Sequence, residues 1–185
     1  GGNGKSVFLS VLTSIMKDYA VTAPMETFTK SRSESHPTEL AMLSGPRLVT
    51  ASETEEGKRW AEARIKSITG GDPITARFMR QDFFTFQPVF KLLIIGNHMP
   101  ALGTVDEAAK RRLRLVPFEN KPTFIDRELD AKLRPEWPAI LSWMITGCLL
   151  WQKSGLESPD NIKTATNHYF SEQDILQQWL EDRCE

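Results

Sequence analysis

The chain has 185 residues, of which 40% are hydrophobic and 25% charged, and a formal net charge of -1. This fits one globular domain with a sizeable core, alone or with a small appendage. The near-zero net charge excludes a global basic field, so any nucleic-acid binding must come from a local patch. Cys148 and Cys184 are far apart and favour a reducing cytosol over a disulfide framework, and no apolar run approaches the roughly 20 residues of a membrane span.

Apolar periodicity and turn residues predict alternating helices and strands. The predicted helices, in chain order, span 7–17, 39–43, 60–68, 106–110, 127–133, 139–153 and 162–185. The predicted strands span 19–21, 47–51, 91–95 and 113–118, with a hairpin over 73–86. The strongest of these strands is the apolar run 91–95, which suits the middle of a parallel sheet.

The chain opens with the second half of a P-loop, a glycine-rich turn and a Lys-Ser pair: Gly1, Gly2, Asn3, Gly4, Lys5 and Ser6. Such glycines let backbone N–H groups surround a phosphate, and the following helix points its N-terminus at the same anion. We expect Lys5 to reach the β- and γ-phosphates of ATP and the Ser6 hydroxyl to bind Mg²⁺. The alternative is a chance Gly-Lys-Ser at a helix start. The full motif needs an earlier glycine and a strand ahead of Gly1, so we expect a longer protein.

The strand 47–51 is followed by acidic residues, which is typical of a Walker B element. A carboxylate at Glu53 can hold the water shell of a metal and orient an attacking water. Glu55 and Glu56 instead favour the N-terminus of the next helix. Ser52 stands where many P-loop enzymes place a second acid, so Glu53 is expected to serve both metal and water.

The predicted hairpin is basic and aromatic. Lys66, Arg77 and Arg80 place cations in and around it, and we expect them to contact single-stranded DNA. Its phenylalanines are expected to pack in the core, because apolar residues at strand spacing usually do so.

Polar residues follow the strand 91–95. Asn97 stands at its carboxyl end, where an amide can hydrogen-bond the γ-phosphate and the attacking water; the alternative is an asparagine that only turns the chain. Arg111 and Arg112 follow the helix 106–110. They are either solvated surface or an arginine finger supplied to a neighbouring subunit.

The C-terminal third is helical. The helix 139–153 carries one apolar face, the run 158–160 is a linker signal, and the final helix would turn Trp179 and Leu180 towards a partner. The predicted division is an ATPase core over 1–120, a helical part over 121–156, and a linker with the start of a further region over 157–185. His36, His98 and His168 lack metal-ligand spacing and are assigned to no metal.

Together these motifs resemble the superfamily-3 helicase module of phage and plasmid primase–helicase proteins. The matching residues lie at 2–6, 47–55, 66, 69–77, 91–100, 106–108, 111–112 and 116–118. The resemblance implies an α/β, AAA+-like P-loop NTPase core with a mostly parallel sheet flanked by helices, a β-hairpin insertion and a C-terminal helical extension. It also implies a ring, usually a hexamer, with ATP between neighbours.

The resemblance assigns a role to each matching residue. Lys5 and Ser6 hold phosphate and Mg²⁺, Glu53 polarises water beside the metal, and Asn97 senses the γ-phosphate. Either Arg111 or Arg112 reaches into the neighbouring site, and the hairpin enters the central channel and pulls single-stranded DNA. Residues from 162 onward join the motor to a winged-helix region, and a primase domain often lies upstream.

The expected function is an ATP-driven DNA helicase of phage or prophage replication in the bacterial cytoplasm. One alternative is a P-loop ATPase that remodels protein, such as a loader. The other is a non-catalytic fragment that binds DNA or only assembles.

Overall fold

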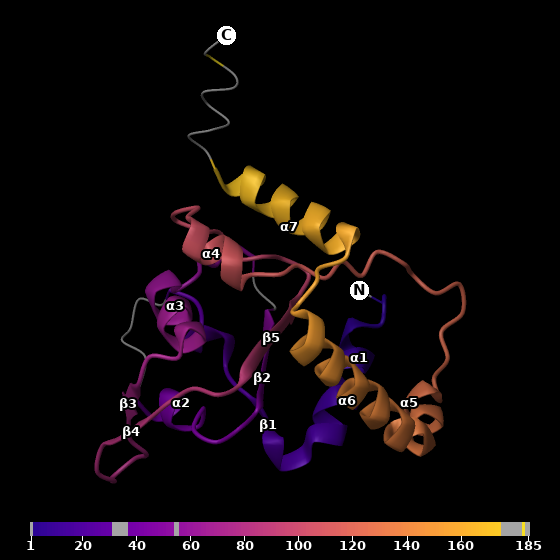
Figure 1. Cartoon of the computed structure of the whole chain (residues 1–185), viewed down its shortest axis with the longest axis horizontal. Coiled ribbons are helices and arrows are strands. Elements are labelled where there is room, and N and C mark those ends of the chain that lie inside the picture. Colours follow the sequence, from indigo (N-terminus) through magenta and orange to yellow (C-terminus); the bar gives the residue numbers. More distant parts are fainter. Residues whose placement is uncertain (1, 31–36, 54–55, 175–182, 184–185) are drawn as a thin grey trace.

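The computed structural model describes residues 2–30, 37–53, 56–174 and 183 (Figure 1). In chain order the elements are α1 (Lys5–Met16), η1 (Lys17–Tyr19), β1 (Ala20–Thr22), η2 (Met25–Thr27), α2 (Pro37–Ala41), β2 (Leu48–Glu53), α3 (Glu62–Gly70), β3 (Ile74–Ala76), β4 (Phe84–Phe86), β5 (Lys91–Gly96), α4 (Glu107–Arg112), α5 (Leu129–Leu133), η3 (Arg134–Glu136), α6 (Trp137–Ser154) and α7 (Asp160–Gln173).

The central sheet is parallel and has the strand order β1-β2-β5. The middle strand is β2, in which Val49, Thr50 and Ala51 are fully buried because helices cover both faces of the sheet. The register pairs Glu53 at the end of β2 with Gly96 at the end of β5. The predicted α/β fold with a parallel sheet flanked by helices is therefore confirmed, and the AAA+-like type of core stays a prediction.

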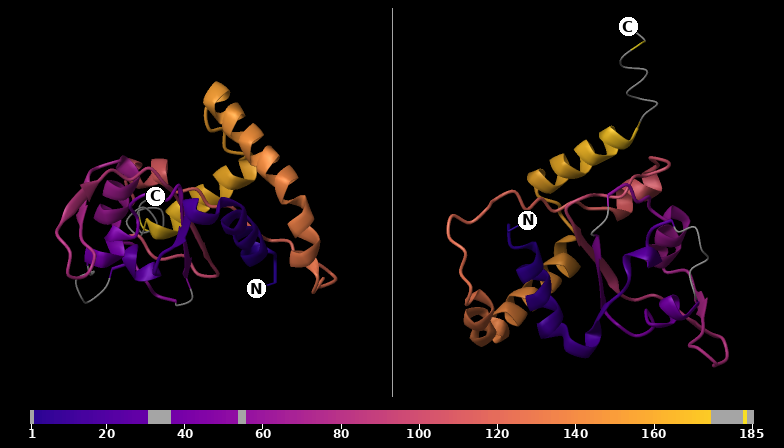
Figure 2. Two further views of the ribbon diagram at one scale, coloured as in Figure 1. Left: turned by 90° about the horizontal axis from the view of Figure 1, so that it is seen from below. Right: turned by 180° about the vertical axis from the view of Figure 1, so that it is seen from behind.

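Helices pack on both sides of this sheet (Figure 2). On one side, α3 contributes Ile65 and Ile68 to the buried cluster that contains Val49, and Trp60 joins them from the segment ahead of α3. On the other side, α1 lies against β1 and β2, with α6 beside it. Residues of β2 and α3 therefore belong to one buried cluster.

The predicted hairpin is present and projects from the body of the molecule (Figure 1 and the right view of Figure 2). Its strands β3 and β4 pair antiparallel, with Thr75 opposite Thr85. Ile74 and Ala76 are buried on the side where β3 contacts α2. The base of the hairpin is thus anchored, while its tip extends away from the sheet.

The strand predicted over 113–118 is not formed. Leu113 has extended backbone angles (φ −89°, ψ 137°), but residues 113–118 pair with no strand in the part of the chain that the structure describes. For the same reason β5, expected in the middle of the sheet, lies at its edge beside β2. A strand needs a hydrogen-bonded neighbour. Between β5 and residues 113–115 there is a cavity instead.

Two helices differ from their predictions. The helix α4 continues to Arg112, so that both arginines form its last turn instead of following it. The apolar face predicted for α6 is mostly exposed, with Ile145 at 52% and Leu149 at 60%. Only Ile140 and Met144, one turn apart, are half-buried, because α6 packs on its neighbours along a narrow stripe.

Helix α7 is fastened across the carboxyl side of the sheet by side-chain hydrogen bonds. The Trp60 Nε1–H donates to the Tyr169 hydroxyl at 2.9 Å, and that hydroxyl donates to the Pro100 carbonyl at 2.5 Å. The Leu115 N–H donates to Thr166 Oγ1 at 3.0 Å. The predictions for Trp179 and Leu180 lie outside the described residues. Among the described helices, none is both long enough and apolar enough to cross a membrane.

Candidate functional site

The start of α1 has the backbone of a phosphate-binding turn. Gly4, the N-cap residue, has φ of 85°, and Gly2 has φ of 86°, angles that residues with a side chain rarely adopt. No side chain caps α1, so its first N–H groups remain available to an anion. The Lys5 ammonium donates to Asn3 Oδ1 at 3.1 Å, and the Asn3 amide donates to the Phe118 carbonyl. These bonds hold the turn in place beside Phe118.

The strands β2 and β5 end at the same edge of the sheet as this turn. Because Glu53 pairs with Gly96, Asn97 leaves the sheet level with the end of β2. Helix α1 runs back along the sheet to the start of β1, which places its N-terminus at that same edge (Figure 1). Open parallel sheets bind their ligands at this carboxyl edge. The structure therefore gathers Gly2–Ser6, Glu53 and Asn97 at one edge.

This edge fits a magnesium nucleotide. The uncapped N–H groups and the Lys5 ammonium suit an anionic phosphate, and Ser6 is exposed in the first turn of α1. Within the described ranges, no three His, Cys, Asp or Glu side chains gather as a ready metal site. Ser6 and Glu53 are the residues that would hold a Mg²⁺ ion here, together with phosphate oxygens and water. Glu55 lies outside the described residues.

The two arginines of α4 have different surroundings. Arg111 is exposed, and its Nε–H donates to the backbone of its own helix at 3.3 Å. Arg112 is half-buried, and its Nη1–H donates to a carbonyl of its own helix at 2.9 Å. A Cβ atom added at Gly70 would lie 3.4 Å from Arg112 Nη2, so this guanidinium packs on the end of α3. Arg111 alone of the pair extends from the surface.

Lys66 on α3 links this helix to the N-cap of α4. Its ammonium donates to Asp106 Oδ2, while Asp106 Oδ1 accepts the Ala109 N–H at 2.8 Å and so caps α4. The hydrogen bond from Lys66, followed by that from Ala109, holds the pKa of Asp106 below its usual range. Lys66 thus has an ionic partner on α4, whereas its predicted contact with DNA stays a prediction.

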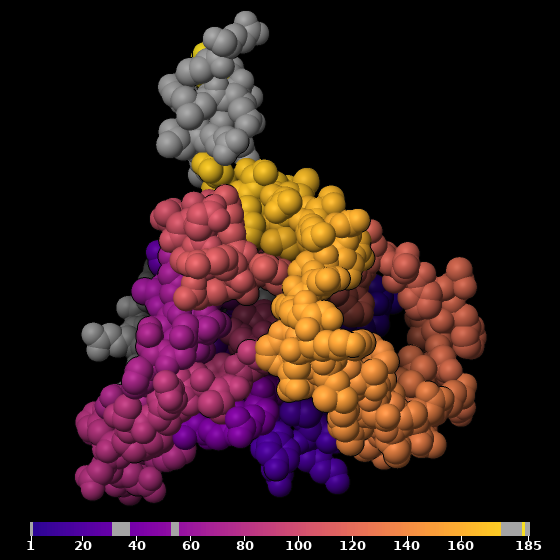
Figure 3. Space-filling model, in the orientation of Figure 1, coloured from indigo at the N-terminus to yellow at the C-terminus, as the bar shows by residue number. Residues whose placement is uncertain are grey.

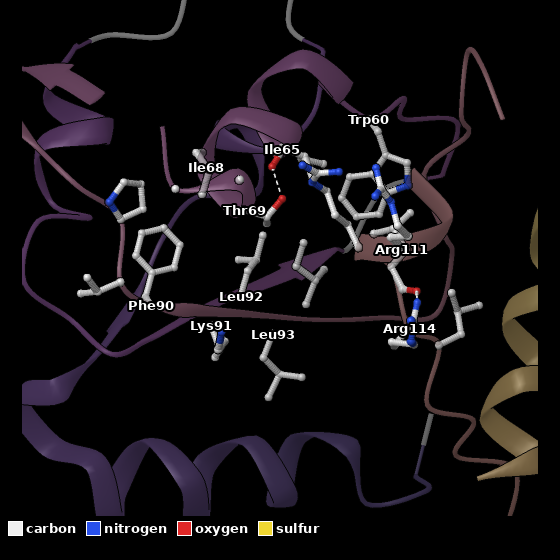
Figure 4. A pocket seen from close by; sticks show the side chains of 18 of the residues that line it. Trp60, Ile65, Ile68, Thr69, Phe90, Lys91, Leu92, Leu93, Arg111 and Arg114 are labelled. Atoms are coloured by element: carbon white, nitrogen blue, oxygen red, sulfur yellow. Dashed lines mark hydrogen bonds between the residues drawn. The ribbon is translucent and has the colours of Figure 1, made fainter. Parts of the chain in front are cut away.

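A cavity of about 510 Å³ opens along the edge of β5 that faces residues 113–115. The space-filling view shows a hollow with α4 above it and α3 to one side (Figure 3). In the close view, Leu92 points from β5 towards Thr69 on α3, whereas Leu93 points to the opposite side (Figure 4). Arg111 and Arg114 lie at one end of the cavity. Residues 113–115 line this cavity opposite β5 and form no strand with it.

The hairpin tip carries the two remaining predicted DNA contacts. The register that places Thr75 opposite Thr85 also places Arg77 opposite Phe83 on the same outward face. The guanidinium carbon of Arg77 lies 4.6 Å from the centroid of the Phe83 ring. Arg80 is exposed at the turn, where it adopts φ of 60°. Both cations are therefore at the tip, away from the carboxyl edge of the sheet.

The sequence predictions gave no site role to three residues that organise these regions: Asp106, Tyr169 and Phe83. An aspartate just ahead of a helix is a capping signal that indicates Asp106 as the N-cap of α4. The outward side of Phe83 follows from strand alternation once the register is known. No sequence signal indicates that Tyr169 bonds to Trp60, which lies 109 positions earlier.

The chain matches several viral proteins. Two of these matches cover nearly all of this chain, which spans about a fifth of the length of each of those two proteins. It is 28% identical over 207 residues to "Putative helicase 022R" of Frog virus 3 (isolate Goorha), covering 98% of this chain and 21% of that protein. It is 29% identical over 205 residues to "Putative helicase L207/L206" of Acanthamoeba polyphaga mimivirus, with the same coverage. It is 32% identical over 134 residues to "Putative helicase 121R" of Invertebrate iridescent virus 3, covering 69% of this chain and 14% of that protein.

A family model described as a family of unknown function (DUF5906) matches residues 1–112. The matched region includes the turn at Gly4, the ends of β2 and β5, the hairpin and both arginines of α4. Because this region is more than half of the 185 residues, the chain belongs to the family of unknown function DUF5906.

Proposed function

We propose that this chain is the ATPase core of a DNA helicase motor, which hydrolyses ATP with Mg²⁺ and translocates on single-stranded DNA. The observation that carries the proposal is the edge shared by three elements. The uncapped N-terminus of α1 lies there together with the ends of β2 and β5. The names of the viral relatives, which match 98% of the chain, support the same function.

The residues at this edge divide the work of phosphoryl transfer. The Lys5 ammonium and the N–H groups of α1 neutralise charge on the phosphates, which is where most catalysis of this reaction arises. Bound Mg²⁺ would add further neutralisation and orient the phosphate oxygens. Glu53 polarises the attacking water, and the neutral amide of Asn97 hydrogen-bonds the γ-phosphate and that water. Ser6 supplies a hydroxyl ligand to the metal.

We assign the cation supplied to a neighbouring site to Arg111. Its guanidinium is exposed, whereas that of Arg112 packs against the end of α3. A side chain that must reach another subunit needs the exposed position. Since this cation acts between copies, the proposal includes a ring, and the resemblance favours six subunits.

The phage or prophage setting of the motor rests on the resemblance. We propose a primase domain upstream in the full-length protein and a role in replication of a phage or prophage in the bacterial cytoplasm. The relatives named as putative helicases are all viral proteins, which supports a viral helicase.

Nucleotide binding by the full-length protein tests the site directly. A fluorescent ATP analogue with Mg²⁺ should lose at least about tenfold in affinity in Lys5→Ala, because a charge-assisted bond to phosphate is removed. Lys153→Ala, an exposed lysine at the end of α6, is the matched control and should bind as the parent does. Parental affinity in Lys5→Ala would overturn the assignment.

A further inference from the structure

The phenylalanines of the hairpin divide between its two faces. Phe84 and Phe86 are half-buried, with ring centroids 5.9 Å apart, on the side that carries the buried Ile74 and Ala76. Phe83 is on the other side and is 59% exposed. Of these rings, Phe86 packs against the buried core cluster, whereas Phe84 stacks on Phe78, with ring centroids 5.8 Å apart. Phe78 is 41% exposed, so the prediction that the phenylalanines pack in the core is wrong for Phe78 and Phe83.

The outward face of the hairpin presents a flat ring beside a cation. The Arg77 guanidinium lies 4.6 Å from the Phe83 ring centroid, and the next outward pair towards the base is polar, with Thr75 Oγ1 and Thr85 Oγ1 3.1 Å apart. The turn adds the exposed Arg80 and the 70% exposed Met79. The tip therefore holds apolar and cationic groups side by side, and Phe83 remains 59% exposed among them.

We infer that Phe83 is a stacking platform for an unpaired nucleobase and that Arg77 binds the adjoining phosphate. This inference rests on the proposed function and deepens it. A nucleotide offers a flat base and an anionic phosphate close together, which complements the ring and cation of this pair. Stacking on an aromatic ring tolerates any base, as a motor that moves along DNA requires.

The charges at the tip favour nucleic acid over an apolar protein partner. Between residues 77 and 83 there are two cations, Arg77 and Arg80, against one carboxylate, Asp82. A protein surface docking on Phe83 and Met79 would have to desolvate or pair the flanking guanidinium groups. A phosphate backbone pairs with them directly.

The test measures binding of the full-length protein to fluorescein-labelled oligothymidylate and to the same strand with abasic sites in place of thymidine. Phe83→Ala should weaken binding to oligothymidylate by roughly tenfold. Phe83→Trp should retain parental affinity, because it keeps the platform. On the abasic strand the parent and Phe83→Ala should bind equally, because no base is left to stack.

Salt dependence separates the two members of the pair. Arg77→Ala should reduce the slope of log K against log salt by about 1, whereas Phe83→Ala should leave it unchanged. Phe124→Ala, at a 78% exposed phenylalanine between α4 and α5, is the matched control and should bind as the parent does.

The outcomes distinguish this inference from the function on which it rests. Equal affinity of the parent and Phe83→Ala for oligothymidylate would overturn the stacking role alone. Failure of the parent to bind either strand at low salt would overturn the DNA contact and the proposed motor together. A change in oligomeric state in Phe83→Ala, with unchanged DNA affinity, would assign the tip to a protein contact and overturn the inference.

Discussion

Lys66 on α3 donates a hydrogen bond to Asp106, the same carboxylate that caps α4. The Lys66 and Asp106 side chains are 30% and 39% exposed, so the pair lies at the boundary between the core and water. Because α4 carries Arg111 in its last turn, a contact that fixes the start of this helix also positions that guanidinium. Lys66 is therefore a positioning residue for the proposed reaction.

Substitution of Asp106 separates the ion pair from the cap. Asp106→Asn keeps an oxygen for the Ala109 N–H but loses the charge that Lys66 binds, whereas Asp106→Ala loses both. We expect ATPase activity to fall in the order parent, Asn, Ala, by about tenfold or more for Ala, because α4 shifts. Nucleotide binding should be retained. The control is Glu107→Gln, which removes the exposed ion pair between Glu107 and Lys110 on the same helix. Parental activity in Asp106→Ala would contradict the positioning role.

The same pair predicts a dependence of stability on pH. Its hydrogen bonds, first from Lys66 and then from Ala109, lower the pKa of Asp106 in the folded state. The stabilisation is therefore present above the unfolded pKa, about 3.9, and is lost as pH falls through the lower folded pKa. Chemical unfolding at a series of pH values should show the parent losing its advantage over Asp106→Asn in acid. An advantage that grows in acid would contradict the assignment.

Arg111→Ala should lower ATP turnover by at least about a hundredfold, because a trans arginine supplies charge stabilisation in the transition state. Mixing provides the sharper test. In a mixed ring, some Arg111→Ala subunits supply Lys5 to an interface at which a Lys5→Ala neighbour supplies Arg111. Such an interface has both residues and is intact. Equal mixing should therefore regenerate roughly a quarter of the interfaces and a corresponding fraction of activity. Absence of any recovery from two inactive variants that still assemble would contradict a role in trans.

Arg112→Ala should act differently. Its guanidinium packs on the end of α3, so we expect a lower midpoint of thermal unfolding as well as lower activity. Arg111→Ala, at an exposed position, should keep the parental midpoint.

Tyr169→Phe removes the acceptor of the Trp60 Nε1–H and the donor to the Pro100 carbonyl. Since Trp60 is 2% exposed, its N–H would be left unpaired in the core, at a cost of about 1–3 kcal/mol in the free energy of unfolding. Tyr19→Phe, at a 61% exposed tyrosine, is the matched control and should change little. If Tyr169→Phe has the same free energy of unfolding as the parent, the hydrogen bonds of the Tyr169 hydroxyl contribute nothing to stability.

The burial of Tyr169 also gives an alkaline prediction. Burial raises the pKa of its hydroxyl to about 12, with a smaller opposing effect of the Trp60 hydrogen bond. Because the folded pKa is above the unfolded value of about 10, the neutral hydroxyl stabilises the fold below pH 10, and this is lost as pH rises towards 12. The stability difference between the parent and Tyr169→Phe should shrink over that range.

The sequence predicted those parts of the fold that depend on local pattern. The apolar run at β5, the β-branched run at β2 and the Gly-Lys-Ser start of α1 each specify an element from a few neighbouring residues. Their order then places Glu53 and Asn97 at one edge, because parallel strands joined by helices end on the same side. The candidate nucleotide site could therefore be assembled before its geometry was known.

What the sequence did not predict depends on partners that are distant along the chain. The ion pair of Lys66 could not be predicted from the local pattern, because its partner, Asp106, stands 40 positions later. The strand expected over 113–118 requires a neighbour, and a pattern cannot show that a cavity lies beside β5 instead. Phe83 was grouped with Phe84 and Phe86 because the face of each ring follows only from the hairpin register.

The most direct test of the proposed motor is ATP hydrolysis by the full-length protein, with and without single-stranded DNA, beside Glu53→Gln. Glu56→Gln, three positions later and exposed, is the matched control. We predict that DNA stimulates hydrolysis in the parent and in Glu56→Gln, and that Glu53→Gln binds ATP but has lost hydrolysis. If DNA does not change the rate of hydrolysis, the motor is contradicted and a protein-remodelling ATPase is favoured. If Glu53→Gln hydrolyses ATP at the parental rate, the assigned site is contradicted.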